Sequence, residues 1–324
     1  MTNSLERIFY PIEKQMEALN EQMKQLLLSK SAYIEDISNY LSAQRGKQLR
    51  PAMVFLSAGI NGAINQKSVD CATITEFVHL SSLVHDDVID VGLQRHGHPT
   101  LNVVYNNKTA VLAGDFLLAR CLQKIIQMQD FQILQMIADT FETMVKAELT
   151  HLQCTTITCS EENYLNIVKA KTAKLIETCF VLGSISVNCP PNLLPKWRQI
   201  GFNVGVAFQL KDDLFDYMPE NQSHKDVFKD INEHKITLPL IATLKNMEQY
   251  QKEELLDFYL HHSGTEAECK EIVKTVSDNG GIEYVNQLID NYLNPCFEFI
   301  AIQKDSPYKD ALQNLFNFLK NRNF

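Results

Sequence analysis

The residues of this chain best suited to bind a cation form two acidic triplets with the same spacing. The first is Asp86-Asp87-Val88-Ile89-Asp90, a DDxxD pattern at the end of an apolar helical segment. Asp86 and Asp90 are four residues apart and therefore share one face of a helix, where like charges repel each other. Because this repulsion costs free energy, a bound multivalent cation is the usual way to offset it.

The second triplet repeats this spacing on another long helical segment, directly after residues 208–211 (FQLK). Its members are Asp212, Asp213 and Asp216. One triplet alone is as well explained by a solvated helix end, but two identical triplets in apolar helices are not. Zn²⁺ would require His or Cys ligands and Ca²⁺ an EF-hand loop, whereas Mg²⁺ binds carboxylates together with phosphate oxygens. The two triplets therefore predict Mg²⁺ ions that hold a polyphosphate.

Basic side chains flank both triplets, as a diphosphate site requires. Taken singly, each of them reads as a solvated surface charge, and only as a set do they indicate an anion site. They are Lys47, Arg50, His79, Arg95, His96, Lys171, Lys225 and Lys235.

Helical periodicity positions these residues throughout the chain. Apolar residues recur at spacings of three and four from Leu5 to Leu19, and we find no convincing alternating strand pattern. Only 12 of the 324 residues are Gly and 10 are Pro, while 45% are hydrophobic, which favours long helices around a sizeable core. Segments 92–100 and 219–234 read as polar loops. With no linker-like segment, we expect one all-α domain over residues 1–324, a bundle of roughly ten or more helices.

The overall composition excludes several classes of protein. A formal net charge of −9 opposes binding to nucleic acid. There is no run of about 18 apolar residues, and residues 1–25 lack the apolar core of a signal peptide. We therefore expect no transmembrane segment and a cytoplasmic location. The eight cysteines have no metal-ligand spacing and read as buried, reduced thiols.

The motifs, taken in their order along the chain, resemble the trans-isoprenyl diphosphate synthases, also called the polyprenyl synthetase family. The match covers nearly the whole chain, from residues 46–47 (GK) through residues 235–239 (KITLP) to residues 280–282 (GGI). The resemblance implies an isoprenoid synthase type fold around a central cavity, and a C₂ homodimer. It also implies a prenyltransferase that condenses isopentenyl diphosphate with an allylic diphosphate to lengthen a trans-polyprenyl diphosphate.

The same resemblance implies a role for each aspartate. Three Mg²⁺ ions would bind the allylic diphosphate in the active site. Asp86, Asp90 and Asp212 would be the direct metal ligands. The remaining aspartates would lie close by or act through water; they are Asp87, Asp213 and Asp216.

Substrate contacts are implied for three further groups of residues. Lys47, Arg50 and His79 match residues that hold the diphosphate of isopentenyl diphosphate. The matches to residues that clamp the allylic diphosphate are Arg95, Lys171, Lys225 and Lys235. Thr172 and Gln209 match groups whose oxygens face the developing carbocation.

Three positions depart from the family pattern. His96 stands where a second Arg is usual, which predicts a weaker or pH-dependent clamp on isopentenyl diphosphate. Arg45 replaces the Gly that usually precedes residues 46–47, which restricts that loop. Phe228 stands where a Gly commonly follows Lys225, which predicts a different closure of the loop after the second triplet. None of the three removes a metal ligand, so we expect effects on rate and affinity and not on reaction type.

Residues upstream of Asp86 bear on product length. Short-chain enzymes of this family often carry a bulky aromatic residue about one turn before the first triplet, where it forms the floor of the product tunnel. This chain has Ser81 and Ser82 there, and the next layers are Val78 and Thr75. The absence of an aromatic floor predicts a product longer than C15, with C30 to C40 favoured over C20.

Two other functions remain as alternatives. Terpene cyclases also combine a DDxxD pattern with a helical bundle, but they usually lack the second triplet and have no use for the residues that match the isopentenyl diphosphate site. A regulatory subunit of a heteromeric synthase is the non-enzymatic alternative. Such subunits tend to lose the aspartates, and all six are present here.

Overall fold

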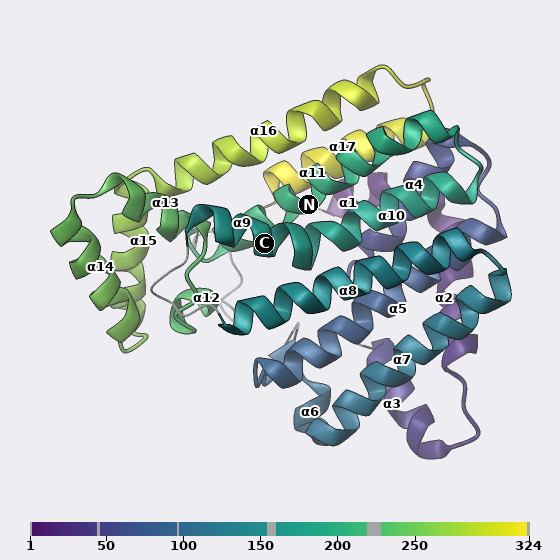
Figure 1. The fold of residues 1–324 in the computed structure, drawn as a ribbon, viewed down its shortest axis with the longest axis horizontal. Coiled ribbons are helices and arrows are strands. Elements are labelled where there is room, and N and C mark those ends of the chain that lie inside the picture. The colour runs from purple at the N-terminus through teal and green to yellow at the C-terminus, as the bar shows by residue number, and fades with distance from the viewer. Residues whose placement is uncertain (1, 44–45, 96, 154–159, 219–227, 323–324) are drawn as a thin grey trace. The chain divides into compact units, whose positions relative to one another are not determined.

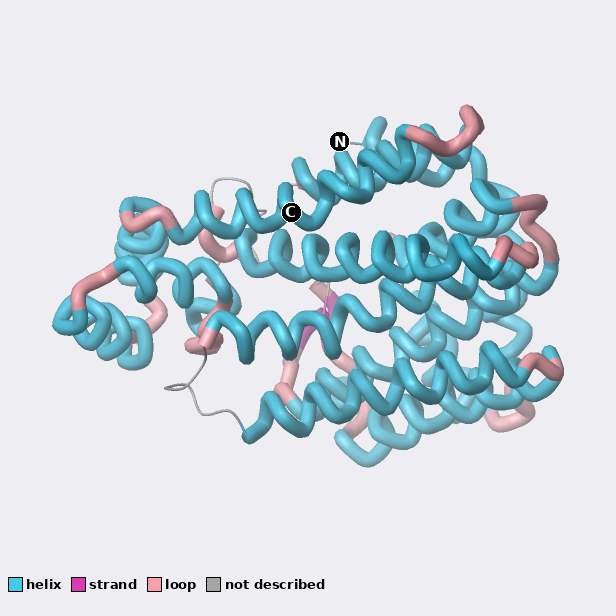
Figure 2. The backbone as a smooth tube through the Cα atoms, turned by 45° about the horizontal axis from the view of Figure 1, so that its top comes forward, coloured by secondary structure: helices cyan, strands magenta, loops and turns pink. Residues whose placement is uncertain are grey.

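Helices make up nearly all of the regular structure in this protein. The computed structural model describes residues 2–43, 46–95, 97–153, 160–218 and 228–322. Figure 2 shows helices joined by short loops, which confirms the all-α prediction. Within those ranges the strands are limited to one short hairpin, in which β1 (Gln94–Arg95) runs antiparallel to β2 (His98–Pro99). This hairpin lies inside segment 92–100, which we predicted as a loop.

The chain divides into two compact units. Unit 1 consists of residues Met1–Glu142, Leu175–Gly201 and Gln303–Asn314. Unit 2 consists of residues Thr143–Lys174, Phe202–Ile302 and Leu315–Phe324. The single domain over residues 1–324 and its central cavity remain predictions. The first triplet belongs to unit 1 and the second to unit 2.

The helices of unit 1 come mainly from the first half of the chain. They are α1 (Thr2–Phe9), η1 (Tyr10–Ile12), α2 (Glu13–Leu27), α3 (Ala32–Ala43), α4 (Leu49–Asn61), α5 (Gln66–Ile89), α6 (Leu101–Val104), α7 (Asn107–Met128), nearly all of α10 (Lys174–Ser186), and η4 (Pro191–Leu193).

Unit 2 contains most of the later helices. They are α9 (Glu161–Val168), the π-helical turn η3 (Lys169–Ala173), α12 (Lys229–Asn232), α13 (Leu238–Asn246), α14 (Gln249–His261), α15 (Glu266–Asp278) and α16 (Gly281–Ala301). Three helices have residues in both units: α8 (Phe131–Gln153), α11 (Leu194–Phe215) and α17 (Pro307–Asn321).

Helix α5 carries the first triplet and is the best-buried long helix of unit 1. Its first turn is closed by a capping box, in which the Asn65 side chain accepts from the backbone N–H of Ser68 and the Ser68 hydroxyl accepts from that of Asn65. The helix packs against α4 and α7, and Figure 1 shows α7 alongside it. Ile74, Phe77 and Val78 are fully buried. Burial of this kind fixes the helix that ends at the first triplet.

A separate apolar cluster in unit 2 packs around the end of α11. Its members include Tyr217, Phe228, Ile231 and Tyr259, all at most 5% exposed. Phe228 has a backbone φ of 63°, in the left-handed region that favours Gly. Phe228 therefore adopts the conformation expected of the Gly it replaces, and burial of its ring offsets the strain. The closure of the preceding loop concerns residues 219–227, which lie outside the described residues.

Two expectations from composition can be compared with the structure. The six cysteines among the described residues are free and buried: Cys71, Cys121, Cys179, Cys189, Cys269 and Cys296. No helix in the described ranges combines the length and apolar character needed to span a bilayer.

Candidate active site

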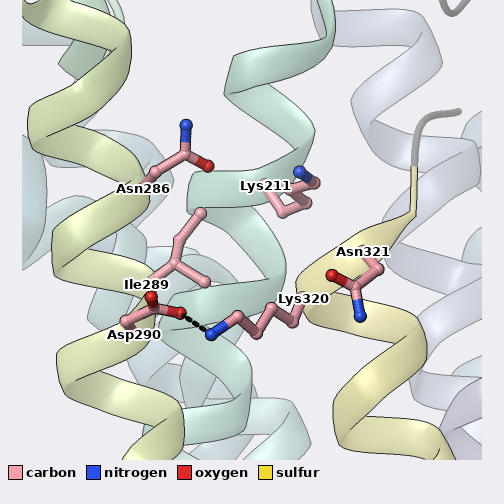
Figure 3. Close-up of a pocket in the computed structure, with 6 residues that line it drawn as sticks. All are labelled: Lys211, Asn286, Ile289, Asp290, Lys320 and Asn321. Carbon is pink, nitrogen blue, oxygen red and sulfur yellow. Dashed lines mark ion pairs between the residues drawn. The ribbon is translucent and has the colours of Figure 1, made fainter.

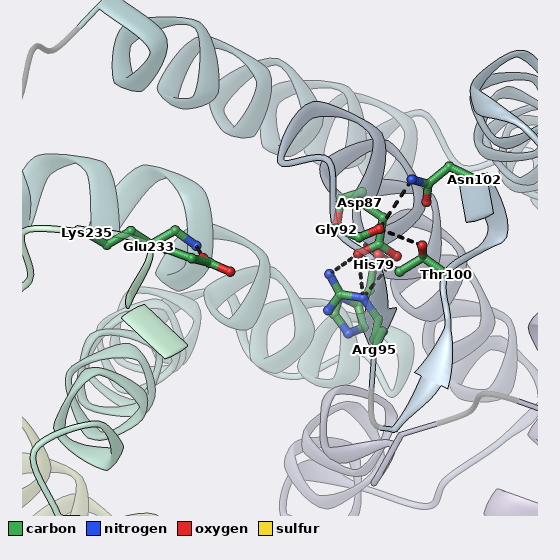
Figure 4. A network of polar contacts seen from close by, with 9 residues as sticks. His79, Asp87, Gly92, Arg95, Thr100, Asn102, Glu233 and Lys235 are labelled. Atoms are coloured by element: carbon green, nitrogen blue, oxygen red, sulfur yellow. Dashed lines mark hydrogen bonds and ion pairs between the residues drawn. The ribbon is translucent and has the colours of Figure 1, made fainter. Parts of the chain in front are cut away.

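The first triplet lies at the end of α5, and its three carboxylates differ in exposure. Asp87 is buried, at 8% exposed, whereas Asp86 is half-buried and Asp90 is exposed. Arg95 of β1 donates to Asp87 Oδ1 from Nη2 at 2.7 Å and from Nε at 3.0 Å (Figure 4). Two charge-assisted bonds from one guanidinium make Arg95 the counter-ion of Asp87. Arg95, predicted to clamp the allylic diphosphate, is therefore engaged with the triplet itself.

The turn that follows the triplet holds the hairpin segment against α5. Val91 has a φ of 53°, a rare conformation for a β-branched residue. Gly92 N–H then donates to the carbonyl of Asp87 at 2.9 Å, while the carbonyl of Gly92 accepts from the Thr100 hydroxyl at 2.6 Å (Figure 4). These bonds fix the path of the chain from the triplet to Arg95.

Residues predicted to bind isopentenyl diphosphate lie around the start of α4. Arg50 in its first turn approaches His79 of α5, with 2.9 Å between Arg50 Nη1 and His79 Nε2. Because Arg can only donate, His79 Nε2 must accept, and the ring proton then lies on Nδ1. Lys47 is exposed just before the helix. The structure thus brings Arg50 and His79 together, while His96 and Arg45 lie outside the described residues.

The second triplet is more deeply buried than the first. Asp213 is 3% exposed and accepts from Gln209 Nε2 at 3.0 Å. Burial raises the pKa of Asp213 well above its usual value, with further contributions from the charges of Asp230 and Asp216. Asp216 accepts from the backbone N–H groups of Asp230 and Ile231. Burial, with the nearby Asp230 charge, nevertheless raises the pKa of Asp216 to about 7.

Lys171 and Thr172 both lie in the π-helical turn η3. Such turns are often found at functional sites. Lys171 Nζ lies 2.5 Å from Glu148 Oε2. Thr172 Oγ1 donates to Gln209 Oε1 at 2.8 Å, and Gln209 in turn donates to Asp213. A hydrogen-bonded chain therefore links the π-helical turn to the second triplet.

Gly205 permits the close approach of α11 to this turn. A Cβ atom at position 205 would lie 2.5 Å from the Cα atom of Ala173, far inside normal contact distance. Because Gln209 is one helical turn after Gly205, this approach sets its distance from Thr172. A glycine in the middle of α11 thus has a specific packing role.

Of the two lysines predicted after the second triplet, one is described. Lys235 Nζ lies 2.6 Å from Glu233 Oε2, as Figure 4 shows, and 3.8 Å from Asp230 Oδ1. These two carboxylates hold the amine beside Asp230, which itself contacts Asp216 of the second triplet. Lys225 lies outside the described residues.

Three residues near the second triplet were missed by the sequence reasoning. Asp230 is a fourth carboxylate beside the triplet, and burial raises its pKa although Lys235 opposes the shift. Arg322 forms an ion pair with Asp212, with 2.6 Å between Arg322 Nη2 and Asp212 Oδ1. Glu148 holds Lys171. The contact of Asp230 with Asp216 spans 14 positions and that of Arg322 with Asp212 spans 110, so no local spacing marks these residues.

The four residues associated with product length lie on α5 in unit 1. Thr75 and Val78 are fully buried. Ser81 is fully buried too, and its hydroxyl donates to the carbonyl of Gly114 in α7 at 3.0 Å. Ser82 is half-buried and donates to a backbone carbonyl one turn back in its own helix. Ser82 is therefore the less buried of the two serines.

The donor atoms of both triplets fit Mg²⁺. In the part of the chain that the structure describes, no three His, Cys, Asp or Glu side chains converge on a ready-made metal site. Mg²⁺ commonly keeps several waters and takes one or two carboxylates together with substrate phosphate oxygens. Asp86, Asp90 and Asp212 offer oxygen donors of that kind, each with some exposure. They suit an ion that arrives with a diphosphate.

A pocket of about 440 Å³ in unit 2 contains none of the predicted site residues (Figure 3). It is lined by Lys211, Asn286, Ile289, Asp290, Lys320 and Asn321. Lys320 Nζ lies 2.7 Å from Asp290 Oδ1, and burial, with the charge of Arg322, lowers the pKa of Lys211. Its polar lining differs from the apolar tunnel that a growing prenyl chain requires.

Comparisons with known proteins agree with the motifs. The family model described as polyprenyl synthetase matches residues 31–276. An all-trans-nonaprenyl-diphosphate synthase (geranyl-diphosphate specific) of Rhodobacter capsulatus is 30% identical over 95% of this chain and 95% of its own length. An octaprenyl diphosphate synthase of Haemophilus influenzae is 29% identical over 99% of this chain and 98% of its own.

Solved structures show the same fold over the whole chain. A polyprenyl synthase from Caulobacter crescentus, complexed with calcium and isoprenyl diphosphate, has a TM-score of 0.89 at 26% identity and covers 99% of this chain and 98% of its own. A decaprenyl diphosphate synthase from Rhodobacter capsulatus has a TM-score of 0.90 at 25% identity, with 99% of both chains covered. The fold is therefore that of the isoprenoid synthases, and the chain belongs to the polyprenyl synthetase family of prenyltransferases.

Proposed function

We propose that this protein is a Mg²⁺-dependent synthase that condenses isopentenyl diphosphate with an allylic diphosphate to lengthen a trans-polyprenyl diphosphate. The observation that carries the proposal is the presence of two DDxxD triplets on separate helices, each with its own basic residues. Oxygen donors at Asp86, Asp90 and Asp212 suit the three Mg²⁺ ions expected with bound substrate. The complex of the Caulobacter relative with calcium and isoprenyl diphosphate supports a divalent metal in this family.

The proposed reaction begins with loss of diphosphate from the allylic substrate. Bound Mg²⁺ would stabilise the negative charge that develops on the departing diphosphate. Lys171 and Lys235 would bind that diphosphate, and each is already positioned by a carboxylate, Glu148 for Lys171 and Glu233 for Lys235. Fixed cations of this kind stabilise a transition state because they need little reorganisation when charge appears.

The hydrogen-bonded pair of Thr172 and Gln209 would face the carbocation that remains. Thr172 donates to Gln209 Oε1, and Gln209 donates to Asp213. Their oxygen lone pairs are thereby held in fixed directions, which favours a positive charge nearby. Isopentenyl diphosphate would be held by Lys47, Arg50 and His79, and its double bond would then attack the allylic cation to form the new C–C bond. The cation left on the isopentenyl unit would lose a proton to the released diphosphate, which restores a double bond.

We further propose a product longer than C15, in the range C30 to C40. The small residue Ser82 leaves space that an aromatic floor would fill. The names of the relatives support a long product, since they include octaprenyl and nonaprenyl synthases. Each cycle adds one C5 unit, so the product would extend further into the tunnel until its end reaches the floor. The position of that floor would therefore set the product length.

Product analysis with farnesyl diphosphate, isopentenyl diphosphate and Mg²⁺ tests the length. We expect prenyl diphosphates of C30 to C40 from the purified protein, resolved by mass spectrometry. A Ser82→Phe variant is expected to shift the products to shorter chains, whereas the matched Ser82→Ala variant keeps the original length. Only C15 or C20 products from the unchanged protein would contradict the proposed length.

We also propose that the protein acts as a homodimer. Helix α7 exposes a row of apolar side chains within about 100° of one face: Val111, Leu112, Leu122 and Ile126. Leu112 and Ile126 are 67% and 66% exposed, so this face is suited to an apolar partner surface. Light scattering should give twice the chain mass of 37.0 kDa for the unchanged protein. A Leu112→Glu, Ile126→Glu double variant should be a monomer with the mass of one chain.

A further inference from the structure

The end of α17 supplies a side chain that contacts a predicted metal ligand. Arg322 follows the last residue of this helix, and its N–H donates to the carbonyl of Phe318 at 2.8 Å, so the helical path continues through it. The side chain is 5% exposed. A charged group this deeply buried needs specific partners, because burial of an unpaired charge is costly.

The described partners of the Arg322 side chain lie on α11. Arg322 Nη2 donates to Asp212 Oδ1 at 2.6 Å and to the carbonyl of Phe208 at 2.8 Å. The guanidinium carbon lies 4.1 Å from the centre of the Phe208 ring and 5.1 Å from that of Phe215. Phe208, Asp212 and Phe215 are spaced four and three residues apart and form one face of the helix. The guanidinium is thus fixed by two hydrogen bonds and two aromatic faces.

The contact with Arg322 restricts the orientation of the Asp212 carboxylate. Asp212 is the most exposed member of the second triplet, at 36% for its side chain, and its χ angles would otherwise be free to vary. The fixed guanidinium holds Oδ1 and therefore sets the plane of the carboxylate. Carboxylates that bind metals are commonly oriented in this way by hydrogen bonds from residues behind them.

The charge of Arg322 also matters for the carboxylates around Asp212. Burial raises the pKa of Asp230, and the negative charge of Asp212 adds to that rise. Four carboxylates lie in one region of unit 2, and Arg322 is a buried cation in direct contact with the one expected to bind metal. It offsets repulsion that would otherwise push the Asp212 side chain toward solvent.

We propose that Arg322 is a positioning residue that orients Asp212 for Mg²⁺ binding at the second triplet. The inference rests on the proposed function. Arg322 acts through Asp212 and is not itself a metal ligand. Its neighbour Lys320, which pairs with Asp290 and not with Asp212, provides a matched control on the same helix end.

The test uses the purified full chain with Mn²⁺ as a paramagnetic substitute for Mg²⁺ and inorganic diphosphate as the anion. Free Mn²⁺ is measured by electron paramagnetic resonance in a titration. We expect Arg322→Ala to weaken Mn²⁺ affinity by about 10- to 100-fold, and Arg322→Lys to weaken it less, since the charge remains but the planar two-bond contact is lost. Lys320→Ala should leave Mn²⁺ affinity unchanged, because Lys320 pairs with Asp290.

Thermal unfolding without metal separates positioning from a purely structural role. If Arg322→Ala lowers the melting temperature but leaves Mn²⁺ affinity unchanged, Arg322 only anchors α17 and the inference is wrong. Tighter Mn²⁺ binding in this variant would show that Arg322 competes with the metal, which also overturns it. Absence of Mn²⁺–diphosphate binding by the unchanged protein would instead contradict the proposed function, and the inference with it.

Discussion

The two aspartate triplets share one spacing, but different partners neutralise them. In the first triplet the buried member, Asp87, is paired with Arg95 of the following hairpin, while Asp86 is half-buried and Asp90 is exposed. In the second triplet the ion pair is made by the more exposed member, Asp212, with Arg322. Identical sequence motifs therefore offer a metal two different electrostatic environments.

Burial explains the difference between the triplets. Asp213 and Asp216 lie at 3% and 6% exposed, beside the further carboxylate of Asp230, and their pKa values are raised chiefly by that burial. No cation pairs directly with either carboxylate among the described contacts of these two residues. Two members of the second triplet thus have pKa values raised by burial, whereas the buried member of the first triplet is paired with a guanidinium.

The largest expected effect comes from removing a predicted metal ligand from either triplet. Asp86→Ala and Asp212→Ala should each lower the elongation rate by about 10³-fold or more, because charge stabilisation by a metal is worth several kcal/mol. Steady-state kinetics with saturating Mg²⁺ measure this. The exposed Asp278→Ala variant on α15 is the control. Full activity of either triplet variant would remove that triplet from the proposed metal site.

The pairing of Asp87 should make the first triplet sensitive to loss of its counter-ion. Arg95→Ala leaves a buried carboxylate unpaired and should lower the free energy of unfolding by about 2 kcal/mol, less than for a fully buried pair because Arg95 is 29% exposed. Urea denaturation measures the change. The Arg95→Ala, Asp87→Asn double variant should recover part of the loss, and no recovery would mean that the pair is not the cause.

The raised pKa values predict a pH dependence for the second triplet. The pKa of Asp216 lies near 4 in the unfolded chain, and burial raises it to about 7 in the folded protein. Between these values the folded state binds more protons than the unfolded state, so the free energy of unfolding falls as pH rises from about 4 to about 7. Denaturation in the presence of a chelator measures this slope. Asp216→Asn should flatten it, and an unchanged slope would assign the effect to other groups.

The smallest expected effect concerns the turn after the first triplet. Val91 is 73% exposed and has a φ of 53°, so its side chain adds strain and little burial. Val91→Gly should raise the free energy of unfolding by about 0.5 to 1 kcal/mol, because Gly adopts this conformation without steric cost. Thermal unfolding measures it. A loss of stability would show that the turn depends on the valine side chain.

The features that could be predicted from sequence are those set by local spacing. The long helices and both triplets follow from periodicity and motif spacing. The grouping of Arg50 with His79 was implied by the family resemblance. Arg95 was identified as functional, but its bond to Asp87 depends on the short hairpin, which segment 92–100 does not reveal. Its predicted contact with the allylic diphosphate remains a prediction.

The features that escaped prediction depend on contacts between distant segments. Arg322 is 110 residues from Asp212, and only packing of α17 on α11 brings them together. The π-helical turn at Lys169–Ala173 interrupts a helix whose composition gives no sign of it, and its effect depends on the close approach of Gly205. Hydrophobic pattern specifies which face is buried, but it does not specify which polar groups meet within that face.

The central claim is that this chain elongates a prenyl chain by itself. The most direct measurement follows diphosphate release from farnesyl diphosphate by the purified protein with Mg²⁺, with and without isopentenyl diphosphate, alongside product mass. We predict release that requires both substrates and Mg²⁺, coupled to longer prenyl diphosphates. Equal release without isopentenyl diphosphate would indicate a cyclase, and no release without an added partner chain would indicate a subunit of a heteromeric enzyme; either result would contradict the proposal.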